Sequence, residues 1–169
     1  KNLKLTDWTD DIKEIIDNLK LDKVILLGIS MGGVIAQKFI TRYPEKVNKL
    51  ILSDTFGELK SLTEKLAGYS QVLSFKLFQY LPNKWAADII ASSYKDFSEE
   101  VYDYFKQVTY TADFKQLELA RKAVNNIDIL EDLNNISIPV LVMAGDKAKI
   151  MLKPAEKIVE KLNNADFKI

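Results

Sequence analysis

The stretch Lys23-Val-Ile-Leu-Leu-Gly-Ile-Ser-Met-Gly-Gly33 decides how the rest of the sequence is interpreted. Its apolar run, residues 24–27, is too short for a helix and predicts a strand buried on both faces, as in a parallel sheet. Residues 28–33 form a glycine-rich turn. From residue 31 to residue 43 the apolar side chains recur at helical spacing, and Pro44 ends that helix. The stretch is therefore a strand, a tight turn and a helix in direct succession.

The turn contains the pattern G-x-S-x-G centred on Ser30, and Gly33 follows it. A sharp strand-to-helix turn forces the serine into a strained backbone conformation and lifts its hydroxyl clear of the sheet. Gly28 and Gly32, two residues before and two after the serine, are expected to be small because the two backbones pass close together. The N–H of Met31, at the start of the helix, would form half of an oxyanion hole. The motif thus predicts Ser30 as a nucleophile.

Two other interpretations of this turn are open. It is either a plain glycine turn with a surface serine, or a phosphate cradle like those of dinucleotide-binding folds. The cradle pattern G-x-G-x-x-G is absent, because Ser30 occupies the place of the second glycine. A strand directly before the turn and a helix directly after it favour the nucleophile.

Further strands and helices extend the same pattern. Residues 50–52 and 139–143 are short apolar runs, and residues 7–19 carry apolar side chains at helical spacing. After the last of these strands, Pro154 is well placed for the first turn of another helix. Strands that alternate with helices predict an α/β fold, with a parallel sheet, flanking helices and right-handed crossovers.

Residues 58–135 differ from the rest of the chain. They contain no convincing strand, and their apolar side chains recur at helical spacing. Twelve of the 17 aromatic residues lie between Tyr69 and Phe114. We therefore predict an all-helical insertion between two strands of the sheet.

The overall composition narrows the possible partners. Lysine and arginine (24) balance aspartate and glutamate (24), so no long-range field attracts nucleic acid or an anionic membrane. No apolar run approaches the roughly 18 residues that a membrane span needs. The chain has no cysteine, which excludes disulfides and thiol chemistry and fits the cytosol. We expect a cytoplasmic protein that neither binds nucleic acid nor spans a membrane.

The chain resembles the α/β-hydrolase superfamily in three segments outside the helical stretch. Residues 23–33 look like the nucleophile elbow of that family. The other two segments look like the next helix end with its strand, Tyr43-Pro-Glu-Lys-Val47 and Leu50-Ile-Leu-Ser-Asp54, and the strand that leads to the acid loop, Ile136-Ser-Ile-Pro-Val-Leu-Val-Met-Ala-Gly-Asp146.

The resemblance implies a division of the chain into two domains. Residues 1–57 and 136–169 would form an α/β-hydrolase core. Residues 58–135 would form the helical cap, or lid, because they occupy the place in the chain where the family carries it.

In the family the serine acts together with an acid and a histidine, as a catalytic triad. Which residue of this chain would be the acid is ambiguous. In relatives it lies three residues past a glycine in the loop after the third strand, and counting from Gly145 that position is Ala148. Alanine cannot orient a base. Asp146 lies one residue past the glycine, and Asp54 follows the preceding strand, where some relatives place their acid. Aspartates at strand ends also commonly cap backbone amides, so a third interpretation is that neither serves as the acid.

The base of the triad is missing, because the sequence contains no histidine. The resemblance implies the order serine, acid, histidine, with the histidine after one more strand. Residues 165–169 look like the start of that strand, and the family's early strands with their oxyanion segment would precede Lys1, which is not a methionine. The simplest hypothesis is an internal fragment of a longer hydrolase, which would self-associate through the unpaired edge of its nucleophile strand. A complete protein that has lost catalysis is the alternative.

The function implied by these features is hydrolysis of a substrate by a serine nucleophile. Ser30 would attack an acyl carbonyl after a histidine from outside the sequence removes its proton, with no metal or organic cofactor. An aromatic-rich lid favours a small apolar ester or a related acyl substrate, although aromatics at helical spacing are more often lid core. Two other classes remain: a non-catalytic ligand-binding or signalling protein on the same fold, and an interaction module made of the helical insertion alone.

Overall fold

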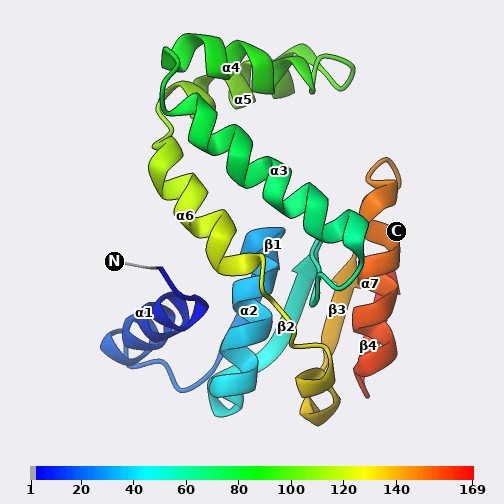
Figure 1. Ribbon diagram of the computed structural model, residues 1–169. Coiled ribbons are helices and arrows are strands. Elements are labelled where there is room, and N and C mark those ends of the chain that lie inside the picture. The colour runs from blue at the N-terminus through cyan, green and yellow to red at the C-terminus, as the bar shows by residue number, and fades with distance from the viewer. Residues whose placement is uncertain (1–2) are drawn as a thin grey trace. The chain divides into compact units, whose positions relative to one another are not determined.

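The computed structural model describes residues 3–169, and the chain divides into two compact units (Figure 1). One unit ends at Ser61 and resumes at Ala123, and the other comprises Leu62–Lys122.

The first unit is built on a four-stranded sheet in the order β1-β2-β3-β4. All three pairings are parallel, which confirms the predicted α/β fold with a parallel sheet. The strand β1 lies at one edge of the sheet and β4 at the other. The strands are β1 (Val24–Ile29), β2 (Val47–Ser53), β3 (Val140–Met143) and β4 (Ala165–Lys168).

Three α-helices belong wholly to this unit: α1 (Leu5–Asn18), α2 (Met31–Arg42) and α7 (Lys149–Lys161). Two short 3-10 helices, η1 (Pro44–Lys46) and η2 (Glu131–Asn135), precede β2 and β3. Pro154 lies inside α7 and not in its first turn, so the start predicted from this proline was wrong. The helix starts earlier because a turn after β3, in which the Ala148 N–H donates to Gly145 O (3.0 Å), already initiates it.

The core of this unit lies on one face of the sheet. Leu50 and Leu52 of β2 and Val140 and Val142 of β3 point to this face, and none is more than 4% exposed. They form one cluster with side chains of α1, α2 and α7 and with Leu162, which follows α7; the helical members are Ile16, Ala36, Phe39, Ile40, Ala155 and Ile158.

The opposite face of the sheet leaves apolar side chains open to solvent. In β1, Ile25, Leu27 and Ile29 are 61%, 55% and 58% exposed, and the strand register places Leu27 beside Ile51. The prediction that residues 24–27 are buried on both faces was therefore wrong. Successive side chains of a strand point to opposite faces, and the helices that build the core of the described chain cover only the other one.

The segments that leave and re-enter this unit are tied together. Glu58 and Asp128 form an isolated antiparallel bridge, and Lys60 forms ion pairs with Glu58 (2.8 Å) and Asp128 (3.2 Å). From α7, Lys157 pairs with Glu58 at 2.8 Å. Hydrogen bonds from Lys157 and Lys60 lower the pKa of the Glu58 carboxyl, so the carboxylate is ionised at neutral pH and both ion pairs are formed.

Every regular element within Leu62–Lys122 is an α-helix. Phe75 and Phe78 contact Phe114, with ring centroids 6.4 and 5.3 Å apart, and Tyr94 stacks on Phe105 at 3.7 Å. These five aromatic residues therefore pack within the unit. Six others are each at least 55% exposed: Tyr69, Tyr80, Trp85, Phe97, Tyr104 and Tyr110. The helices are α3 (Leu62–Phe78), α4 (Asn83–Ser92), α5 (Glu99–Tyr110) and α6 (Phe114–Val124), whose last two residues lie beyond the boundary of the unit.

This helical unit is shorter than the predicted insertion of residues 58–135. Val124, Ile127 and Ile129 pack against Val34 and Phe56 in a second cluster of the sheet unit. The apolar residues that follow the last insertion helix therefore complete the sheet unit, although the sequence between 123 and 135 has no strand pattern of its own.

Close backbone packing at the turn between β1 and α2 involves two of its three glycines. A Cβ on Gly28 would lie 2.5 Å from the backbone oxygen of Gly32 and 2.7 Å from Cα of Gly33. A Cβ on Gly33 would lie 2.5 Å from the side chain of Thr55, whereas one on Gly32 would meet nothing within 4 Å. The strand and helix backbones therefore approach closely, as expected, and a side chain is excluded at Gly28 and Gly33 but has room at Gly32.

We expect Gly28→Ala to destabilise the fold by at least about 2 kcal/mol, because the new methyl group would push strand and helix backbones apart. Gly32→Ala is the matched control. It should leave stability unchanged or raise it by up to about 1 kcal/mol, because alanine is the better helix former. Urea unfolding of the three proteins measures both effects. Equal stability of the two variants would contradict the packing described here.

We also expect this 169-residue chain to self-associate through β1, whose edge is unpaired and whose outer face is apolar. Leu27→Lys should weaken the association about tenfold, because burying one leucine contributes about 1.5–3 kcal/mol. Ile15→Lys, which changes a 58%-exposed side chain on α1, should have no such effect. Sedimentation velocity over a concentration series is the measurement. A monomeric wild type, or equal effects of both substitutions, would refute this prediction.

Candidate active site

The turn between β1 and α2 places Ser30 at the carboxyl end of β1, with its side chain exposed. Its backbone has φ 50° and ψ −117°, and Lys20 and Asp54 are the other described non-glycine residues with positive φ. Such a conformation is costly for a residue with a Cβ and persists only where neighbouring contacts hold it. The strain predicted for Ser30 from the motif is present in the structure.

The first turn of α2 directs its backbone donors around Ser30. The N–H groups of Gly33 and Val34 donate to the carbonyl oxygen of Ser30 at 3.0 and 3.3 Å. Met31 is the first residue of α2, so its N–H precedes the hydrogen-bond ladder and has no acceptor within the helix. That placement suits a donor to a developing oxyanion.

Asp54 lies at the same carboxyl edge of the sheet, directly after β2, the strand next to β1. The N–H of Ser30 donates to Ser53 O at 3.0 Å, and Asp54 follows Ser53 directly. The carboxylate is held on both oxygens: Oδ1 accepts from the Gly145 N–H (2.9 Å) and Oδ2 from the Ser53 hydroxyl (2.9 Å). Asp54 thus joins the carboxyl ends of β2 and β3.

Asp146 and Ala148 lie in the turn that follows β3. The side chain of Asp146 is exposed, and it forms no hydrogen bond or ion pair with any other residue between 3 and 169. A Cβ on Gly145 would lie 3.6 Å from Oδ1 of Asp54 and 3.7 Å from Cβ of Ala148. The carboxylate of Asp54 therefore stands against the loop in which the resemblance expects an acid at position 148.

Two buried residues of this region were not singled out by the sequence analysis. Thr55 is 1% exposed and donates to Ser30 O at 2.7 Å. Gln37 is fully buried, and its Nε2 donates to Gly33 O and Phe56 O, both at 3.1 Å. Gln37 had no signal, because it is two residues from both Ile35 and Phe39 and so lies on the opposite side of the helix from the predicted apolar stripe. Thr55 had no signal either.

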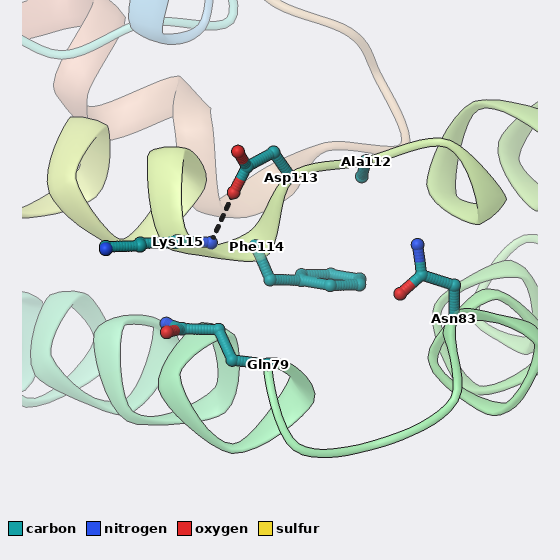
Figure 2. Close-up of a pocket in the computed structure, with 6 residues that line it drawn as sticks. All are labelled: Gln79, Asn83, Ala112, Asp113, Phe114 and Lys115. Carbon is teal, nitrogen blue, oxygen red and sulfur yellow. Dashed lines mark hydrogen bonds between the residues drawn. The ribbon is translucent and has the colours of Figure 1, made fainter.

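The helical unit contains a separate hollow of about 340 Å³, shown in Figure 2. Its polar groups are engaged within the unit, since Asp113 accepts from the Lys115 N–H at the start of α6 and Gln79 donates to Glu118. None of the predicted catalytic residues lines it. The residues around it are Gln79, Asn83, Ala112, Asp113, Phe114 and Lys115.

Within residues 3–169, no three acidic side chains come together in a way that could hold a metal ion. Among the helices of the described chain, none combines the length and the apolar composition needed to cross a membrane.

The chain is similar in sequence to proteins that are named as hydrolases or lactonases. The 3-oxoadipate enol-lactonase 2 of Acinetobacter baylyi is 24% identical over 138 residues, which cover 80% of this chain and 50% of that protein. The AB hydrolase superfamily protein YisY of Bacillus subtilis is 29% identical over 150 residues, covering 83% of this chain and 55% of the relative. The chain thus spans about half the length of these two relatives.

Solved structures share the fold. MenH from S. aureus superposes with a TM-score of 0.86 at 18% identity, over 99% of this chain and 66% of that one. The family described as serine aminopeptidase S33 matches residues 3–169, nearly the whole sequence. The chain therefore belongs to this family of the α/β-hydrolase superfamily.

Proposed function

We propose that this chain carries the nucleophile of a serine hydrolase that cleaves a small apolar ester or a related acyl compound. The observation that supports the proposal most is the conformation of Ser30. Its backbone is strained at a strand–turn–helix junction, and its hydroxyl is exposed at the carboxyl edge of a parallel sheet. A surface serine in an ordinary turn has no need of that strain.

In the proposed reaction, Oγ of Ser30 attacks the acyl carbonyl while a general base removes the hydroxyl proton. The Met31 N–H stabilises the oxyanion of the tetrahedral intermediate. The alcohol then leaves with a proton from the base, and water hydrolyses the acyl-enzyme by the same steps in reverse. The sequence contains no histidine, so an imidazole base would come from residues outside it.

We propose Asp54 as the acid that orients this base, in preference to Asp146. Hydrogen bonds to both of its oxygens fix the carboxylate of Asp54, one residue past the strand residue that binds Ser30. Each carboxylate oxygen accepts more than one hydrogen bond, so Asp54 retains capacity for an imidazole N–H. Asp146 is exposed and has no described partner that would orient it.

Two observations support an ester as the substrate: the chemistry of the nucleophile and the name of one relative. A serine nucleophile with an oxyanion donor suits acyl transfer, and a lactone, the compound class in the name of the Acinetobacter relative, is a cyclic ester. The second candidate is a non-catalytic binding protein on the same fold. Ala148, at the position where the superfamily usually carries its acid, favours that alternative.

A fluorophosphonate probe tests the nucleophile. In the longest natural protein that contains this sequence, we expect one adduct at Ser30, read by intact mass and peptide mapping. Ser30→Ala should reduce the labelling rate at least about 1,000-fold, because the other serines are not activated. Ser70→Ala, on α3, is the control and should label normally. A folded protein that contains histidine and does not label at Ser30 would support the binding protein instead.

The acid assignment is tested in that same protein. Asp54→Asn keeps an acceptor for the Gly145 N–H and removes the charge, so we expect kcat to fall about 10,000-fold with the fold intact. Asp146→Asn should change kcat less than about threefold, as expected for an unpartnered surface carboxylate. Ester hydrolysis and urea unfolding are measured together. A large loss in Asp146→Asn with a small one in Asp54→Asn would reverse the assignment.

A further inference from the structure

The strained conformation of Ser30 requires contacts that hold it, and those contacts come from the end of β2. The two peptide groups that flank Ser30 each have one partner there. The Ser30 N–H donates to Ser53 O (3.0 Å), and the Ser30 carbonyl accepts from Oγ1 of Thr55 (2.7 Å). Fixing both peptide planes fixes φ and ψ of the residue between them.

The Ser30 carbonyl and the Met31 N–H belong to the same peptide group. In a trans peptide these two bonds point in opposite directions within one plane, so a donor held on the carbonyl side sets the direction of the N–H. Donation to the carbonyl also polarises the peptide and strengthens its N–H as a donor. The Thr55 hydroxyl is thus coupled to the proposed oxyanion donor, although the two groups are on opposite sides of the peptide.

Packing holds Thr55 in this orientation. Its side chain is 1% exposed and fills the space above Gly33, where a Cβ would come within 2.5 to 2.7 Å of Cβ, Oγ1 and Cγ2 of the threonine. The next residue is anchored as well, because Gln37 donates to Phe56 O and Gly33 O, both at 3.1 Å. Two buried polar side chains therefore bind the segment after β2 to the first turn of α2.

We propose that Thr55 is a positioning residue that orients the Ser30–Met31 peptide, and with it the serine side chain and the oxyanion donor. This inference rests on the proposed function for its catalytic meaning. The Ser30 carbonyl also accepts from the Gly33 and Val34 N–H groups, and the structural content of the proposal is the contribution that the Thr55 hydroxyl adds to them. This contribution is testable on this chain without any acyl chemistry.

The chain has no cysteine, so Ser30→Cys introduces a single thiol at the turn. We expect alkylation of this thiol by iodoacetamide to titrate below the ordinary cysteine range, because the thiolate lies at the N-terminus of α2. Adding Thr55→Val, which keeps the shape and removes the hydroxyl, should raise the titration midpoint by about one pH unit. It should also slow alkylation at neutral pH about three- to tenfold.

The matched variant is Thr55→Ser, which keeps the hydroxyl and should leave the midpoint within about 0.2 pH units of the parent. Ser70→Cys on α3 provides an ordinary thiol, which Thr55→Val should not affect. Near-ultraviolet circular dichroism and urea unfolding confirm that each variant is folded. If Thr55→Val does not fold, Thr55→Ala, which cannot crowd Gly33, gives the same readout.

An unchanged midpoint in folded Thr55→Val or Thr55→Ala, or an equal rise in Thr55→Ser, would overturn the proposal. The catalytic reading has its own test in the longer protein, where Thr55→Val should lower kcat about tenfold without a change in KM. The two tests can also disagree. If the thiol midpoint depends on Thr55 but Ser30 never reacts with acyl probes, the proposed hydrolase activity is refuted and the positioning role of Thr55 is not.

Discussion

The pairing of β1 with β2 continues past the ends of both strands. The hydrogen bonds of this continuation hold the carboxyl edge of the sheet together. Through them Ser30 keeps a backbone conformation that a residue with a side chain rarely adopts. Asp54, the first residue after β2, extends the same set of contacts to the loop after β3. The strained serine, its neighbouring helix N-terminus and a fixed carboxylate are therefore consequences of one parallel register.

The one-sided core explains how this edge is supported. Helices α1, α2 and α7 pack on a single face of the sheet, and the buried side chains of β2 and β3 lie at its centre. The helix α2 carries both the first turn that surrounds Ser30 and the side chains, Phe39 and Ile40, that anchor it in this core. Movement of the turn is thus limited by the same packing that stabilises the unit.

Several features of the fold could be predicted from the sequence, and the errors have physical causes. The turn after β1 was predictable because strand, glycines and helix are contiguous. Burial of residues 24–27 on both faces was wrong, because an apolar run does not reveal whether helices cover one face or two. The start of α7 was misplaced because the preference of proline for a first turn does not exclude an interior position, where it costs the helix one backbone hydrogen bond. The lid role of the helical unit and the identity of the acid stay predictions.

The sequence by itself determined the strand–turn–helix around Ser30, the parallel α/β class and the helical insertion, because periodicity and glycine chemistry act over a few residues. Only the tertiary structure decided which face of β1 is covered and which side chains hold Ser30. Thr55 lies 25 residues from Ser30, and Asp54 lies 91 residues from its partner Gly145. Such contacts depend on strand order and register across helical crossovers, which leave no local pattern in the sequence.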